Sequence, residues 1–97
     1  MRVHLHRSVY ADVSEIMDYY ERVAGPELAD DFYQELRTFI LKAANQPLRF
    51  RIYERDLRRV NLARFPYHFL FRVKGDGIRL LILRHNSRHP SLGLERK

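Results

Sequence analysis

The sequence predicts an α+β fold in which two helices cover one face of a mostly antiparallel sheet. Three observations carry this prediction: a short alternating segment opens the chain, two stretches with helical periodicity follow, and three alternating segments occupy the second half. A chain of 97 residues has room for one modest core. We therefore expect a single domain over residues 1–97.

The opening segment RVHLH, residues 2–6, has the period of a half-buried strand. Val3 and Leu5 fall on one side, and His4 and His6 fall on the other. We expect the histidine pair to face solvent or a partner.

Two amphipathic helices are expected next, joined by Gly25-Pro26. Ser8 is the expected N-cap of the first helix, and Asn45-Gln46-Pro47 ends the second. Each helix has one apolar stripe with spacings of three and four. The stripes consist of Val9, Val13, Ile16, Tyr20 and Val23, and of Leu28, Phe32, Leu36, Phe39 and Ala43.

Three strands are then expected at residues 58–65, 67–73 and 78–85, forming an antiparallel meander. Phe65-Pro66 marks the first turn, and the Asp-Gly pair at Asp76 marks the second. The region around Glu54, Arg55 and Asp56 is expected to be loop.

Alternation assigns the apolar residues of the last two strands to faces. Tyr67, Phe69, Phe71 and Val73 share one face, and the three aromatic residues should pack under the helices as core. Ile78, Leu80 and Ile82 are expected on one face of the last strand, and Leu81 and Leu83 on the other.

Composition excludes several classes of protein. The chain has no cysteine, so it has no disulfide, thiolate metal site or thiol nucleophile. Its longest aliphatic run, Leu80 to Leu83, is far shorter than the roughly 20 residues of a membrane-spanning helix. No signal-peptide pattern opens the chain. We expect a cytoplasmic protein without a membrane partner.

Charge is divided unevenly between the two halves. Residues 1–48 contain 5 basic and 8 acidic residues, whereas residues 49–97 contain 13 basic and 4 acidic ones. Of the 18 basic residues 15 are arginine, whose planar fork pairs with phosphate or carboxylate groups. The second half therefore favours an anionic partner, nucleic acid or an acidic polypeptide, over a basic surface kept for solubility.

The stretch ILRHNSRHP, residues 82–90, concentrates chemically active side chains. His85 and His89 have the spacing of zinc ligands, but that pair normally lies on a helix, and Arg84 and Arg88 would repel a cation. Ser87 has no convincing triad partner, and glycine-rich phosphate loops are absent. We expect no metal and no cofactor.

The remaining interpretation of these basic residues is an anion-binding surface. Five arginines lie on or at the ends of neighbouring strands, namely Arg58, Arg59, Arg79, Arg84 and Arg88. They could contact phosphates or an acidic protein surface. Cleavage of RNA without a metal stays open as well, because arginines can stabilise charge developing on phosphorus and His85 could act as an acid or base.

The segments RRVNLARFPYHFLFRV and ILRHNSRHP, with a closing ER, resemble the RelE/ParE superfamily of toxins from type II toxin–antitoxin pairs. The order of strand, two helices and three strands is similar over nearly the whole chain. The resemblance implies a growth-inhibiting toxin held inactive by a cognate antitoxin in a hetero-oligomer. ParE-like toxins poison DNA gyrase, whereas RelE-like toxins cleave messenger RNA on the ribosome.

Individual positions favour the ParE-like branch. Arg59 and Arg88 match the RelE pattern, but Asn61 stands where a lysine is expected, His68 where an arginine is, and Leu94 where a tyrosine is. His68 and His85 could partly substitute for the missing groups.

We predict a ParE-like inhibitor of gyrase that acts by binding rather than by catalysis. Its target-binding residues are predicted to be Arg59, Arg84, His85 and Arg88. The first alternative is a ribosome-dependent, metal-independent endoribonuclease that uses Arg59, His68, His85 and Arg88. The second is a non-toxic module that binds nucleic acid or protein. An Arg-rich sheet and apolar grooves beside the helix pair would suit an acidic antitoxin segment and its helix.

Overall fold

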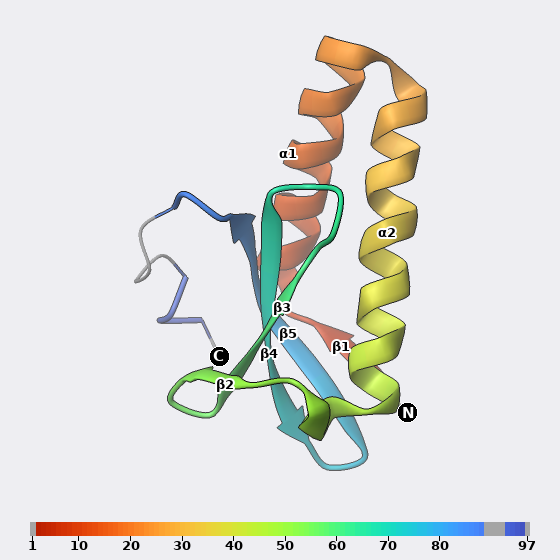
Figure 1. Ribbon diagram of the computed structural model, residues 1–97. Helices are drawn as coiled ribbons and strands as arrows, with labels where there is room; N and C mark the ends of the chain where they lie inside the picture. Colours follow the sequence, from red (N-terminus) through yellow and green to blue (C-terminus); the bar gives the residue numbers. More distant parts are fainter. Residues whose placement is uncertain (1, 89–92, 97) are drawn as a thin grey trace.

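The computed structural model describes residues 2–88 and 93–96, which form two helices and one sheet (Figure 1). The chain opens with β1 (Arg2–Leu5), followed by the helices α1 (Arg7–Ala24) and α2 (Pro26–Asn45). A short 3₁₀ turn precedes four further strands, which are β2 (Ile52–Glu54), β3 (Leu57–Asn61), β4 (Tyr67–Lys74) and β5 (Gly77–His85). The predicted α+β class and the order of its elements are confirmed.

The strands form one mixed sheet in the order β1-β5-β4-β3-β2. β1 runs parallel to β5, and the other neighbours are antiparallel. Gly77, at the start of β5, lies against β1 so closely that a Cβ atom there would come within 2.0 Å of the carbonyl oxygen of Arg2. The parallel pairing of β1 with β5 therefore requires glycine at this position.

β2 is an edge strand that the sequence analysis missed. The region around Glu54, expected to be loop, pairs with β3 through a two-residue turn at Arg55 and Asp56. Arg55 has a φ of 54°, a left-handed conformation that closes the turn. Three residues are too few to show a period in the sequence.

β3 ends at Asn61, four residues before the predicted end of this strand. The backbone N–H groups of Ala63 and Arg64 donate instead to the carboxylate of Glu35 on α2, at 3.1 and 2.9 Å. A helix side chain thus satisfies the backbone where sheet pairing stops.

The start of α1 also differs from the prediction. The helix begins at Arg7, and its N-cap is His6 rather than Ser8, because Nδ1 of His6 accepts the backbone N–H of Ser8 at 3.1 Å. His6 therefore lies beyond β1 and does not share a strand face with His4. Burial, together with Arg79, lowers the pKa of His6, which favours the neutral imidazole that a cap acceptor needs.

The turn between β4 and β5 has Gly75 and Asp76 as its central residues, and Gly77 already pairs with Lys74. Gly75 has a φ of 58°, whereas Asp76 does not have a positive φ. Glycine at the first central position is the requirement of a type II′ turn. The hairpin is as predicted, but the expected Asp-Gly turn lies one residue later than the observed one.

The main core lies between the two helices and one face of the sheet, which we call the helix face. Phe32 and Leu36 of α2 and Val9 of α1 are its fully buried helix residues with the largest side chains. Phe69 and Phe71 of β4 meet them from the sheet, and Tyr67 packs alongside. The predicted core role of these three aromatic residues is confirmed.

A β-bulge in β5 changes the faces predicted for its apolar residues. Leu70 lies opposite Ile82 but Phe71 lies opposite Leu80, so Leu81 is an extra residue without its own partner. Ile82 therefore packs beside Leu81 on the face opposite the helices, which we call the outer face, while Leu80 stays in the main core. The prediction that Ile82 shares a face with Leu80 was wrong for this reason.

Leu83, after the bulge, also changes sides and packs in the main core rather than beside Leu81. In β4, Val73 is exposed at the strand end.

The outer face carries a small apolar cluster of its own, formed by Leu57, Leu70, Leu81 and Ile82. Leu94, from the segment 93–96, packs against this cluster. Arg96 then fastens the segment, since its Nη1 donates to a carboxylate oxygen of Asp12 on α1 at 2.7 Å and to the carbonyl of Leu81 at 3.1 Å.

Candidate target-binding site

The predicted site residues fall on two faces of the sheet. Arg84 and His85 are neighbours on β5 and point to opposite sides, as successive strand residues do. Because the bulge lies before them, Arg84 points to the outer face and His85 to the helix face. His85 stacks edge-on against Tyr67, with the ring centroids 5.1 Å apart.

Arg59, Asn61, His68 and Arg84 lie together on the outer face. Asn61 is opposite His68 across β3 and β4, and His68 is opposite Arg84 across β4 and β5. Nε of Arg59 donates to Oδ1 of Asn61 at 2.9 Å, and its guanidinium lies over the ring of Tyr53, 5.2 Å from the centroid. Arg59 is thereby held in one orientation along the outer face.

Arg84 and His68 are the buried members of this group, at 5% and 2% exposure. Nε of Arg84 donates to Nε2 of His68 at 3.0 Å. A guanidinium always donates, so Nε2 must carry no proton, and Nδ1 then donates to Oδ1 of Asn86 at 2.8 Å. Arg84 thus supports the site from inside the sheet.

His68 is a neutral side chain with both ring nitrogens occupied. Burial lowers its pKa to about 4, against the opposing effect of the hydrogen bond to Asn86, and Arg59 and Arg84 add to the lowering. Such a histidine has neither a free lone pair nor a free proton for a substrate. The geometry disfavours general acid–base work by His68.

His85 and Arg88 open onto a second region, a cavity of about 700 Å³ between α1 and the end of β5. We call it the helix-side cavity. Its walls on α1 carry Glu15 and Tyr19, and Tyr67 of β4 contributes from the sheet. Burial raises the pKa of Tyr67, so its hydroxyl stays protonated. The cavity combines aromatic rings with guanidinium and carboxylate groups, a mixture suited to protein contacts.

Arg88 is an exposed cation of this cavity, as is Arg22 of α1. Within residues 2–88 and 93–96, the guanidinium of Arg88 makes no hydrogen bond or ion pair. Its backbone N–H donates to the carbonyl of His85 at 3.0 Å, which closes a short turn. An arginine that is unpaired among these residues and lies on a hydrogen-bonded turn is available for an anionic group of a partner.

Two other predicted arginines lie apart from the site. Arg58 donates to the carbonyl oxygen of Phe50 at 2.7 Å, on the opposite side of β3 from Arg59. Arg79 lies opposite His4 of β1 and Arg72 of β4, towards the other end of the sheet. The anion-binding cluster is smaller than the sequence suggested.

Asn86 is a site residue that the sequence analysis missed. It follows β5 directly and joins His68 to the turn that carries Arg88. A single polar residue in a turn gives no signal of such a role before its partner is known.

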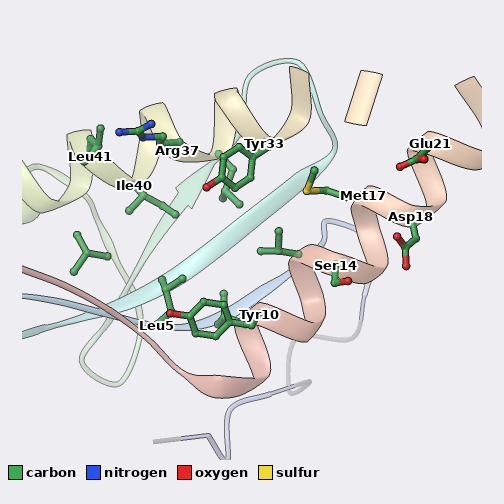
Figure 2. A pocket seen from close by; sticks show the side chains of 14 residues that line it. Leu5, Tyr10, Ser14, Met17, Asp18, Glu21, Tyr33, Arg37, Ile40 and Leu41 are labelled. Atoms are coloured by element: carbon green, nitrogen blue, oxygen red, sulfur yellow. The ribbon is translucent and has the colours of Figure 1, made fainter. Parts of the chain in front are cut away.

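The structure also reveals an apolar groove between α1 and α2, bordered by β1 (Figure 2). We call it the interhelical groove; its volume is about 600 Å³. Tyr10, Tyr33 and Leu41 line it although each is about half exposed or more. The sequence analysis expected apolar grooves beside the helix pair but did not name these residues, because they lie outside the two main stripes.

Charges mark the rim of the interhelical groove. Asp18 and Glu21 extend from α1 at one end, and Arg37 lies on α2 farther along (Figure 2). An amphipathic helix that carries basic residues at one end would match this arrangement.

No group of three potential ligands that could hold a metal ion occurs in the described part of the chain. His89, half of the predicted histidine pair, and Pro90 lie outside the described residues, so the structure does not test that pair. Among the helices of the described ranges, neither is both long and apolar enough to cross a membrane.

Comparison with known proteins connects this geometry to a family. The family described as "ParE toxin of type II toxin-antitoxin system, parDE" matches residues 3–90, nearly the whole chain. The chain belongs to the ParE toxin family. The ParE family match confirms the predicted resemblance to the RelE/ParE superfamily.

A solved structure supports the ParE assignment. It is described as "Chromosomal ParDE TA system from P. aeruginosa" and shares 29% sequence identity with this chain. The TM-score is 0.76, with 88% of this chain and 95% of that chain covered. No curated protein matches the sequence significantly. Family and neighbour together identify a ParE-type toxin of a toxin–antitoxin system.

Proposed function

We propose that this ParE family member inhibits growth by binding DNA gyrase and that a cognate antitoxin neutralises it in a hetero-oligomeric complex. Gyrase as a target implies a cytoplasmic protein. Binding would centre on the turn after β5, with His85 and Arg88 in contact with the target. Arg59 would contribute from the outer face, and buried Arg84 would support the surface from within.

The distribution of four residues over two faces is the observation that carries this proposal. An endoribonuclease would need Arg59, His68, His85 and Arg88 around one phosphate. Arg59 and His68 lie on the outer face, whereas His85 and Arg88 line the helix-side cavity. Groups on opposite faces of a sheet are poorly arranged to act on one scissile bond. This favours inhibition by binding over cleavage of messenger RNA.

The interhelical groove supports the proposed antitoxin partner. Its open, apolar walls end in a charged rim, which is the form of a helix-in-groove site. The large exposed side chains Tyr10, Tyr33 and Leu41 favour a partner that covers them. We propose an antitoxin helix as that partner.

The experiment adds purified protein to a gyrase supercoiling assay and, in parallel, to a translation extract programmed with a reporter message. We expect inhibited supercoiling with intact message. Codon-positioned cuts with normal supercoiling would replace the proposal by the endoribonuclease. No effect in either assay and no growth inhibition on expression would indicate the non-toxic binding module.

A further inference from the structure

The buried pair of His68 and Arg84 has no direct access to a partner, and yet it connects to the exposed turn. The link is Asn86, whose Oδ1 accepts the proton on Nδ1 of His68 at 2.8 Å. The backbone N–H of Asn86 also donates to the carbonyl of Pro66 at 2.9 Å, just before β4 begins. Asn86 is therefore bonded to His68 of β4 by its side chain and to the residue before β4 by its backbone.

The turn that follows is closed on His85. The N–H of Arg88 donates to the His85 carbonyl at 3.0 Å, and the N–H of Ser87 donates to Nδ1 of His85 at 3.1 Å. Nδ1 lies only 2.9 Å from the hydroxyl of Ser87 as well. The position of Arg88 therefore follows from the placement of residues 85–87.

We propose that His68 is a positioning residue for target binding: through Asn86 it holds the turn that presents His85 and Arg88. This inference rests on the proposed function and assigns His68 a role different from that of an acid or base. Arg84 is the third member of this hydrogen-bond network, because its Nε–H fixes the tautomer in which Nδ1 of His68 is a donor. The chain of contacts runs from Arg84 through His68 and Asn86 to the turn.

The expected benefit is preorganisation of a long side chain. An arginine on a loose turn must lose conformational freedom when it binds, whereas one on a held turn has already lost part of it. Loss of the acceptor at Asn86 should therefore weaken target binding by roughly three- to tenfold, the cost of ordering one such side chain. The interhelical groove contains none of these residues, so antitoxin binding should stay unchanged.

The test compares Asn86→Ala with Asn86→Asp, which keeps an acceptor oxygen, and with Asn45→Ala, which removes an exposed asparagine at the end of α2. Nitrogen-15 spectra of the wild-type imidazoles at pH 7 should show that Nδ1 of His68 carries a proton and that Nε2 carries none. Hydrogen exchange of the Arg88 N–H should be at least about tenfold faster in Asn86→Ala, as expected for an opened turn, and near the wild-type rate in the other two variants. The concentration that inhibits gyrase should rise for Asn86→Ala and stay at the wild-type value for Asn45→Ala.

Several results would overturn the proposal. The first is a proton on Nε2 of His68. The second is a hydrogen-exchange rate of the Arg88 N–H that is the same in Asn86→Ala as in the wild type. The third is a loss of gyrase inhibition in Asn45→Ala as large as that in Asn86→Ala. If wild-type protein fails to inhibit gyrase, the proposed function fails and the binding role of His68 falls with it. The tautomer and exchange measurements then still decide whether His68 holds the turn.

Discussion

Nε of Arg84 donates a 3.0 Å hydrogen bond to Nε2 of His68, and both side chains are buried in the outer face of the sheet. This contact limits what two of the basic side chains can do for a substrate. His68 is held in its neutral form, and Nε of Arg84 is used in the hydrogen bond to it. The groups left for a partner are Arg59 on the outer face and His85 and Arg88 at the helix-side cavity.

The free energy of unfolding should decrease as the pH is lowered from about 6.5 to about 4, because of His68. Its pKa is about 4 in the folded chain, below the ordinary value of 6.5, so the unfolded chain binds more protons in this window. The contribution of His68 to the free energy of unfolding is complete above pH 6.5 and decreases by about 3 kcal/mol as the pH falls to 4. Urea titrations across this range measure it.

His68→Gln should flatten this pH dependence, leaving a smaller slope from His6, whose pKa is lowered too. An unaltered slope in His68→Gln would show that this side chain is not held neutral.

Leu41→Glu should weaken antitoxin binding without unfolding the chain. Leu41 is an exposed lining residue of the interhelical groove, and a carboxylate there would be desolvated by an apolar helix. We expect at least about a tenfold loss of affinity by calorimetry, corresponding to about 1.4 kcal/mol.

Leu48→Glu is the matched control, because Leu48 is also an exposed leucine but lies outside the groove. Gyrase inhibition should be the same in both variants. Equal antitoxin affinity for the two would place the antitoxin elsewhere.

Arg96→Ala should lower the free energy of unfolding by about 1–2 kcal/mol. Its guanidinium pairs with Asp12 and also satisfies the carbonyl of Leu81, the extra residue of the bulge. Thermal denaturation checks this, with Glu95→Ala as the control at a neighbouring exposed position. A loss no larger than that of Glu95→Ala would mean that the contacts of Arg96 add nothing to the stability of the fold.

Gly77→Ala should separate β1 from β5. The added Cβ would overlap the backbone carbonyl of Arg2, which cannot move without giving up the parallel pairing. We expect a loss of more than about 2 kcal/mol in stability, typical of a disrupted backbone contact. Amide exchange at Val3 and Leu5 should rise first. Wild-type exchange rates there would contradict the close approach.

The sequence predicted the elements well because their signals are periodic and long. The helix stripes and the aromatic alternation of Tyr67, Phe69 and Phe71 each specify a face. Gly25 marks the boundary between the two helices. The bulge at Leu81 was not predicted because Leu80 to Leu83 is an unbroken aliphatic run. Polar and apolar residues do not alternate in it, so the sequence does not show which residues face the helices.

The candidate site was harder to predict because the same bulge changes which residues share a face. The sequence identifies arginines and histidines by type, but the bulge decides which of Arg84 and His85 faces the helices. Asn86 acquires meaning only through its contact with His68. Capping by His6 was missed because serine is the commoner cap and Ser8 stood close by.

The most direct test of the account is inhibition of gyrase supercoiling by wild-type protein, Arg88→Ala and Arg51→Ala. Arg51 is an exposed arginine outside the helix-side cavity, so it controls for the loss of one positive charge. Both variants should fold, with stabilities within about 0.5 kcal/mol of the wild type. We predict that wild-type protein and Arg51→Ala inhibit alike and that Arg88→Ala does not inhibit. Inhibition by folded Arg88→Ala at the wild-type concentration would contradict the account.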